Sequence, residues 1–215
     1  MSKRNSGYRR KPRDNYPTPV GPLAALLDVL PMSSYVYECC PGAGKLAAQL
    51  YERGYGVLTQ PNDFLKVQSL PPQTRAIITN PPFNIAHDII CHALRLMAEH
   101  KKQCTMAMLL PADYDHANRR TYLFRDCLAF AGQVKLNRRI VWFKPKPPKR
   151  AGPSEWHSWF IWDNRRSPSE PPWVRYSTWN EERETEHDGE KHAERIARRH
   201  AANVRGNRRE GARAV

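Results

Sequence analysis

The sequence predicts an α/β fold, a doubly wound, mostly parallel (Rossmann-like) sheet that ends in an antiparallel hairpin. Short apolar runs alternate with helix-like segments over 22–132, which favours strands joined by helical crossovers. The run at 76–79 is apolar and β-branched, as expected for a strand that is buried on both faces. Two further strand-like runs follow each other within 133–163 and predict the terminal hairpin.

The N-terminal half supplies the first strands and helices. Pro22 suits a first helical position, and a leucine-lined face predicts a helix over 22–30. Gly54 is placed to end a second helix. The elements expected after the first helix are, in order, a strand at 35–39, a helix at 44–54 and strands at 55–59 and 76–79.

The C-terminal half continues the alternation before the hairpin. We expect an amphipathic helix at 84–100, a buried strand at 105–111, a helix at 118–132 and strands at 133–143 and 156–163. The connection between the last two strands is too rich in proline to be regular. This organisation predicts three parts: a basic disordered arm at 1–15, one domain at 16–176 and a charged helical or disordered tail at 177–215.

The chain is strongly basic, with a formal net charge of +14 over 215 residues and a pI of about 9.9. That balance favours a polyanionic partner, most simply nucleic acid, over a basic surface that serves only solubility or ribosome association. Two acid-free basic runs, 1–13 and 133–153, flank the apolar centre and suit phosphate contacts. The candidate phosphate-binding residues are Arg9, Arg10, Lys135, Arg138, Arg139, Lys144, Lys146, Lys149 and Arg150.

The five cysteines form no CxxC pair, so the sequence predicts neither a zinc site nor a disulfide framework, and we expect no metal. No signal peptide and no apolar run of membrane-spanning length is evident. These features predict a protein of the reducing cytoplasm with no membrane partner.

The motif ECCPGAGKLA (38–47) follows the first predicted strand. Gly42 and Gly44 allow a tight turn and a close approach of backbone to ligand, and Glu38 could accept a hydrogen bond from an amine-bearing ligand. A P-loop is excluded because Leu46 stands where Ser or Thr is required, and Ala47 replaces the last glycine of a dinucleotide motif. A plain strand–helix turn remains the alternative.

The motif NPPF (80–83) ends the third predicted strand. Asn80 offers an amide oxygen, and the Pro81 carbonyl cannot join a sheet ladder through Pro82, which lacks an N–H. Phe83 supplies a ring beside these two acceptors. The arrangement suits an exocyclic amine on a flat conjugated ring, because accepting both N–H bonds keeps the nitrogen lone pair out of the ring. A simple strand terminator is the alternative.

Taken together, these motifs resemble the phage and prophage N6-adenine DNA methyltransferase-like proteins, a family of S-adenosylmethionine-dependent amino-methyltransferases. The resemblance covers about residues 14–165. The matching segments are YPTP (16–19), ECCPGAG (38–44), DFL (63–65), ITNPPFNIAHDII (77–89), LLPADY (109–114), RRIVWF (138–143) and WHSWFIWD (156–163).

The resemblance implies S-adenosylmethionine as cofactor and assigns each motif a part in the site. Tyr16, Thr18 and Pro19 would close over its methionine end, Glu38, Gly42 and Gly44 would line its sulfonium region, and Asp63 and Phe64 would hold its adenine. Asn80, Pro81, Pro82 and Phe83 would hold the target adenine. Two positions depart from the family: Cys39 stands in place of a proline, and Gln60 in place of the acid that binds the ribose.

The function expected from these residues and the resemblance is methyl transfer to adenine N6 in DNA, with low sequence specificity because no separate recognition domain is evident. The target base would leave the stack to reach the site. Trp142, Trp156, Trp159 and Trp162 could add stacking, although strand tryptophans are more often core. The same chemistry on RNA or on a protein glutamine, and a catalytically degenerate DNA-binding protein, are the alternatives.

Overall fold

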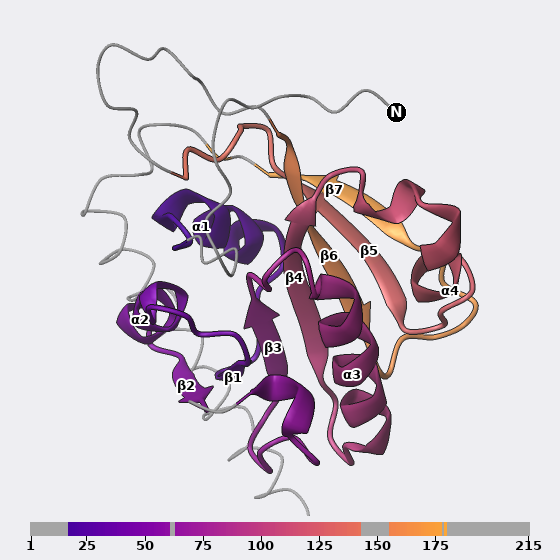
Figure 1. The fold of residues 1–215 in the computed structure, drawn as a ribbon, viewed down its shortest axis with the longest axis horizontal. Coiled ribbons are helices and arrows are strands. Elements are labelled where there is room, and N and C mark those ends of the chain that lie inside the picture. The colour runs from indigo at the N-terminus through magenta and orange to yellow at the C-terminus, as the bar shows by residue number, and fades with distance from the viewer. Residues whose placement is uncertain (1–16, 61–62, 143–154, 178, 180–215) are drawn as a thin grey trace, which may run out of the picture.

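A seven-stranded sheet in the order β2-β1-β3-β4-β6-β5-β7 forms the centre of the computed structural model (Figure 1). The structure describes residues 17–60, 63–142, 155–177 and 179. The strands are β1 (Tyr35–Glu38), β2 (Gly56–Thr59), β3 (Ala76–Thr79), β4 (Thr105–Pro111), β5 (Phe130–Lys135), β6 (His157–Asp163) and β7 (Trp173–Tyr176).

Only β6 runs against its neighbours: it is antiparallel to both β4 and β5, whereas every other adjacent pair is parallel. The predicted fold class is therefore confirmed, including the antiparallel pairing of the last two predicted strands. The edge strand β7, which pairs in parallel with β5, was not predicted. Its four residues lie largely exposed, so no alternating apolar pattern marks them in the sequence.

The helices predicted in the first half are confirmed, with ends shifted by one or two residues. The α-helices are α1 (Val20–Val29), α2 (Lys45–Glu52), α3 (Ala86–Glu99) and α4 (Thr121–Phe124), and short 3-10 turns occupy Phe64–Lys66, Tyr114–His116 and Asn118–Arg120.

The helix predicted over 118–132 was wrong. Only a 3-10 turn and the four residues of α4 are helical there, and β5 begins at Phe130. A short apolar run that is buried throughout does not distinguish a core strand from a core helix by periodicity, and here the run belongs to the strand.

The strand predicted over 133–143 ends early, at Lys135. The Ser177 N–H donates to the Lys135 carbonyl, and its hydroxyl donates to Asn137 Oδ1 at 3.2 Å. The chain leaves the sheet after Lys135, and these bonds keep it joined to the residue that follows β7. Leu136 and Ile140 still pack inward, so the residues after β5 form a cover over the core instead of a strand.

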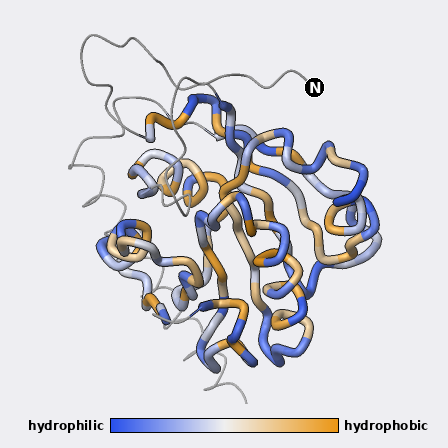
Figure 2. The backbone as a smooth tube through the Cα atoms, viewed as in Figure 1, coloured by the Kyte–Doolittle hydropathy of each residue, from blue (hydrophilic) through white to orange (hydrophobic). Residues whose placement is uncertain are grey.

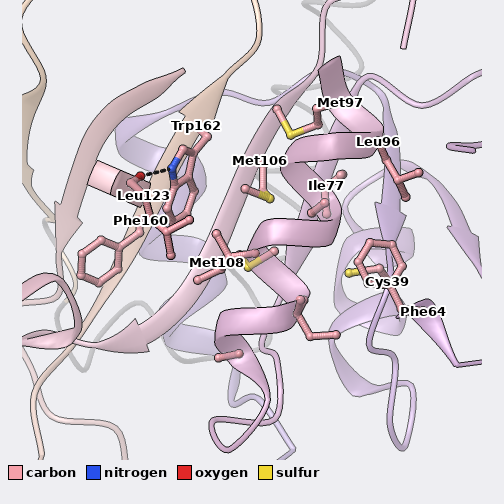
Figure 3. Close-up of a cluster of buried hydrophobic side chains, with 14 of the residues drawn as sticks. Cys39, Phe64, Ile77, Leu96, Met97, Met106, Met108, Leu123, Phe160 and Trp162 are labelled. Atoms are coloured by element: carbon pink, nitrogen blue, oxygen red, sulfur yellow. Dashed lines mark hydrogen bonds between the residues drawn. The ribbon is translucent and has the colours of Figure 1, made fainter. Parts of the chain in front are cut away.

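Alternate residues of each central strand enter two separate cores, one on each side of the sheet. One core contains Ile77, Met106, Met108 and Trp162 and lies under α3 and α4 (Figure 3). The other packs the remaining strand residues, Trp159 among them, against α1 and α2. Figure 2 shows the result along the backbone, with the sheet largely apolar and the connections largely polar.

Two tryptophans considered as possible stacking partners belong to these cores. Trp159 and Trp162 have no exposed surface, and each indole N–H donates to a backbone carbonyl, of Pro22 at 2.8 Å and of Leu123 at 2.9 Å respectively. Buried indoles paired in this way are structural. The hydrogen bond from Trp162 is drawn in Figure 3.

The order of the strands predicts where a ligand would bind. The chain runs from β1 to its neighbour β2 and then crosses to β3 on the other side of β1. In sheets of this kind the usual position of a binding crevice is at the carboxyl ends of the two strands between which the chain reverses, here β1 and β3. The motifs at 38–47 and 80–83 follow these two strand ends.

Replacing Gly132 by Ala should separate β7 from the sheet. Gly132 has φ +148°, and an added Cβ would lie 2.0 Å from the Trp173 carbonyl oxygen in β7. Gly54→Ala is the matched control, because Gly54 has φ +81° with open space around the added atom. In urea unfolding we expect a loss of roughly 3 kcal/mol or more for Gly132→Ala, and of about 1–2 kcal/mol for the control. Equal losses would contradict this packing.

Candidate functional site

The turn between β1 and α2 is built on two glycines with left-handed backbone conformation. Gly42 has φ +52° and Gly44 has φ +76°, which an L-residue adopts only with strain. The Gly44 N–H donates to the Pro41 carbonyl at 2.7 Å and closes the turn. A Cβ added at Gly44 would meet nothing within 4 Å, so the backbone here faces open space. A ligand can therefore approach it closely.

Glu38 joins the ends of β1 and β3. Its side chain is buried, and its Oε1 accepts hydrogen bonds from Thr79 Oγ1 at 2.6 Å and from the Cys40 N–H at 3.0 Å. Burial raises the pKa of Glu38 to about 7, and the two hydrogen bonds oppose that rise. Within the described residues Oε2 accepts no hydrogen bond, so it is the oxygen available to a ligand.

The end of β2 supplies Gln60 beside the same crevice. Its Oε1 accepts a long hydrogen bond, 3.4 Å, from the Tyr37 hydroxyl. The exposed Asp63 begins the next turn, and its Oδ1 accepts from the Leu65 N–H at 3.1 Å. Phe64 is buried between Tyr37 and His92, with ring centroids 6.0 and 5.0 Å away. Its predicted contact with an adenine stays a prediction.

The segment before α1 is tied to the loop after β3. Asn80 Nδ2 donates to Thr18 Oγ1 at 3.1 Å, and Gln49 Nε2 of α2 donates to the Thr18 carbonyl at 2.7 Å. Pro19 follows as the cap of α1. The structure thus brings Thr18 and Pro19 to the crevice, while Tyr16 lies outside the described residues.

The NPPF loop connects β3 to α3. Pro81 is buried, and the Pro82 carbonyl accepts from the Ile85 N–H at 3.1 Å, so the loop folds directly into the helix. Phe83 is only partly buried and packs on two rings from the far end of the sequence. Its centroid lies 6.3 Å from that of Trp142 and 5.7 Å from that of His157, and these two rings lie 5.3 Å apart.

Sequence reasoning missed His157 at the site. It is the first residue of β6, and because β6 runs antiparallel its start lies at the edge where β3 and β4 end. The signal was present in WHSWFIWD, where a histidine opens a buried strand, but only the strand order places it beside NPPF. Trp142 had been considered only as one of several stacking candidates.

Three of the nine predicted phosphate contacts lie in the described part of the chain. Lys135 ends β5 at the same edge, Arg138 lies over Trp179 at 5.9 Å, and Arg139 lies over the exposed Trp156 at 4.9 Å. The other six lie outside the described residues: Arg9, Arg10, Lys144, Lys146, Lys149 and Arg150.

Among the described residues, no group of three or more His, Cys, Asp or Glu side chains could hold a metal ion. In the same part of the chain, no helix combines the length and the apolar character needed to cross a bilayer. The groups at the candidate site are hydrogen-bond acceptors, aromatic rings and an open glycine turn.

No protein-family model and no curated protein matches the chain. Solved structures show a distant likeness. A candidate class I S-adenosylmethionine-dependent methyltransferase from Listeria monocytogenes aligns with a TM-score of 0.48 at 12% identity, over 76% of this chain and 65% of its own. The chain thus spans less than two thirds of that protein.

Two further structures align at lower scores. One is the 23S rRNA methyltransferase ErmE, with a TM-score of 0.39 at 16% identity over 69% of this chain and 70% of its own. The other is a candidate methyltransferase from Thermoplasma acidophilum, with a TM-score of 0.36 at 14% identity over 74% of this chain and 67% of its own. At these scores and identities the likeness assigns no activity to the chain.

Glu38→Gln should change how stability depends on pH. The folded pKa of Glu38 is raised from 4.5 to about 7, so its contribution is fully present below pH 4.5 and is lost as pH rises towards 7. Glutamine keeps an oxygen that accepts from Thr79 and Cys40 but does not titrate. Between pH 5 and 8 we expect wild-type stability to fall by up to about 3 kcal/mol relative to the variant.

The control for this measurement is Glu99→Gln, which removes an exposed carboxyl at the end of α3. Urea unfolding at pH 5 and at pH 8 gives the free energies of unfolding of the wild type and of both variants. If Glu38→Gln kept the wild-type pH slope, the burial of a titrating carboxyl between β1 and β3 would be contradicted.

Proposed function

We propose that the chain transfers a methyl group from S-adenosylmethionine to the N6 amine of adenine in DNA, with low sequence specificity. The observation that carries the proposal is the position of the NPPF loop. It follows β3 at the strand crossover and is joined through Thr79 and Glu38 to the open glycine turn after β1. An amine acceptor and a methyl donor bound in these two places would be neighbours.

The hydrogen bond of Asn80 to Thr18 supports its proposed role. Because its Nδ2 donates to Thr18, its amide oxygen is the end that would accept from the substrate. The Pro81 carbonyl would accept the second N–H of the same amine, as Pro82 has no N–H with which to continue a ladder. Holding both N–H bonds out of the ring plane leaves the lone pair on the nitrogen, where it can attack the methyl carbon of the sulfonium.

The residues at the glycine turn fit the cofactor. S-adenosylmethionine, when bound, supplies a methyl group on a sulfonium. The exposed Gly42 and the open backbone at Gly44 would contact its amino-acid end, with Glu38 Oε2 as an acceptor for the ammonium. Asp63 is exposed at the next turn for the adenine amine, and Gln60 would meet the ribose hydroxyls through its amide. Placing both reactants in line would supply much of the rate.

The basic residues at the same edge favour a nucleic acid. Lys135 ends β5, and Arg138 and Arg139 follow it. The end of β5 lies beside the start of β6 and so beside Phe83. These three basic residues would hold phosphates while the target base leaves the stack, since the acceptor amine is hidden in a duplex. DNA is preferred over RNA and over a protein glutamine because of the resemblance of the motifs.

Two measurements test the proposal. Isothermal titration with S-adenosylmethionine tests cofactor binding, and transfer of a tritiated methyl group is assayed on unmethylated DNA, RNA and a glutamine-containing peptide. Transfer to DNA with N6-methyladenine as product supports the proposal. Transfer only to RNA or to the peptide would establish an alternative substrate. Absence of cofactor binding would contradict the proposal and favour the non-catalytic alternative, as Gln60 in place of an acid could cause.

Asn80→Ala should abolish most of the transfer, because the amine then loses one of its two acceptors. We expect a decrease in kcat of roughly 100-fold or more, the size found when one preorganised hydrogen-bonding group is removed from a site. Gln103→Ala is the matched control, since it removes an exposed amide before β4, at the opposite edge of the sheet. Full activity of Asn80→Ala, measured as tritium incorporated into DNA, would refute the assignment of this loop.

A further inference from the structure

His157 is a buried polar side chain whose ring nitrogens make no well-formed hydrogen bond within the described residues. It is 1% exposed. Leaving such a group unpaired costs roughly 1–3 kcal/mol, so natural proteins rarely keep one without a use. Phenylalanine would fill the same space without the cost. The imidazole at this position therefore calls for a functional explanation.

The register of the sheet places His157 beside the NPPF loop. Thr79, the last residue of β3, lies opposite Met108, and β4 continues for three residues to Pro111, which pairs with His157. The start of β6 thus stands beyond the end of β3, at the level of the loop that follows it. The ring contact between His157 and Phe83, tilted by 33°, shows that this loop reaches it.

Two aromatic rings, Phe83 and Trp142, pack against the imidazole of His157. Both rings are partly exposed. The backbone of His157 is fixed in the sheet, since His157 pairs with Pro111 of β4 and the next residue, Ser158, pairs with Lys135 of β5. Admission of a flat ligand beside the imidazole would therefore require Phe83 and Trp142, which lie in loops, to turn. Burial lowers the pKa of His157 to about 4, with a smaller opposing effect from the Glu155 backbone, so the ring is neutral at physiological pH.

We propose that His157 reads the target base by a hydrogen bond to a ring nitrogen next to the amine. This inference rests on the proposed function. Adenine carries acceptors, N1 and N7, on either side of its N6 amine, and a neutral imidazole offers one N–H donor. Asn80 and Pro81 would then hold the amine. Phe83 and Trp142 would contact the faces of the adenine ring, and His157 would bind its edge. His157 takes no proton in the reaction; it selects and orients the base.

The test uses mixed-sequence DNA oligonucleotides in which adenine is replaced throughout by 1-deazaadenine or by 7-deazaadenine. Each analogue exchanges one ring nitrogen for C–H and keeps the amine. We expect wild-type kcat/KM to fall about tenfold on one of the two analogues, which corresponds to one lost hydrogen bond. His157→Phe should show the same tenfold loss on adenine itself and should no longer discriminate between adenine and that analogue.

The melting temperature of each variant provides a second measurement. His157→Phe should melt at the wild-type temperature or above it, because the substitution removes unpaired nitrogens. His100→Phe is the control: His100 Nε2 pairs with the Thr74 carbonyl at 2.9 Å, at the amino-terminal edge of the sheet, so this variant should lose stability and keep wild-type discrimination. His157→Asn, which restores a donor, should recover part of the discrimination even if His157→Phe folds poorly.

Wild-type discrimination in His157→Phe, or a wild-type protein that treats all three bases alike, would overturn the role of His157 and leave the proposed function standing. A wild-type protein that methylates no adenine DNA would overturn both.

Discussion

One buried hydrogen bond, between Thr79 and Glu38, holds the two halves of the candidate site together. β1 and β3 are adjacent in the sheet, but their loops leave in different directions, one into the glycine turn and the other into NPPF. The charged form of the Glu38 carboxyl is stabilised by its two hydrogen-bond donors and destabilised by its loss of water. The pKa of about 7 reflects that balance. The link from Asn80 through Thr18 to Gln49 of α2 joins the same two loops a second time.

Most of what positions this site could be predicted from the sequence because it is local. Asn80 to Phe83 and Gly42 to Gly44 are contiguous motifs at strand ends, and parallel strands bring their carboxyl ends to one edge. The helix predicted over 118–132 was wrong for the opposite reason. Its apolar residues fit a helix as well as a strand, and only pairing with β6, in which Phe130 lies opposite Trp162, decides between them.

The aromatic cluster of Phe83, Trp142 and His157 could not be predicted in this way. Its members come from three segments that are distant in sequence, and their contact depends on β6 entering the sheet between β4 and β5. The burial of Phe64 is similar, since a ring at a turn in the sequence becomes a core residue once α3 covers it. Motifs indicate the chemistry of a site, whereas the strand order decides which other side chains lie beside those motifs.

The reversed direction of β6 has a consequence for how this protein could diversify. The connection from β5 to β6 leaves the sheet and re-enters it at the same edge, so both of its anchors, near Trp142 and near His157, border the crevice. A change in chain length between these two anchors would leave the pairing of β5 with β6 unchanged. The strand scaffold can therefore tolerate variation in sequence next to the crevice.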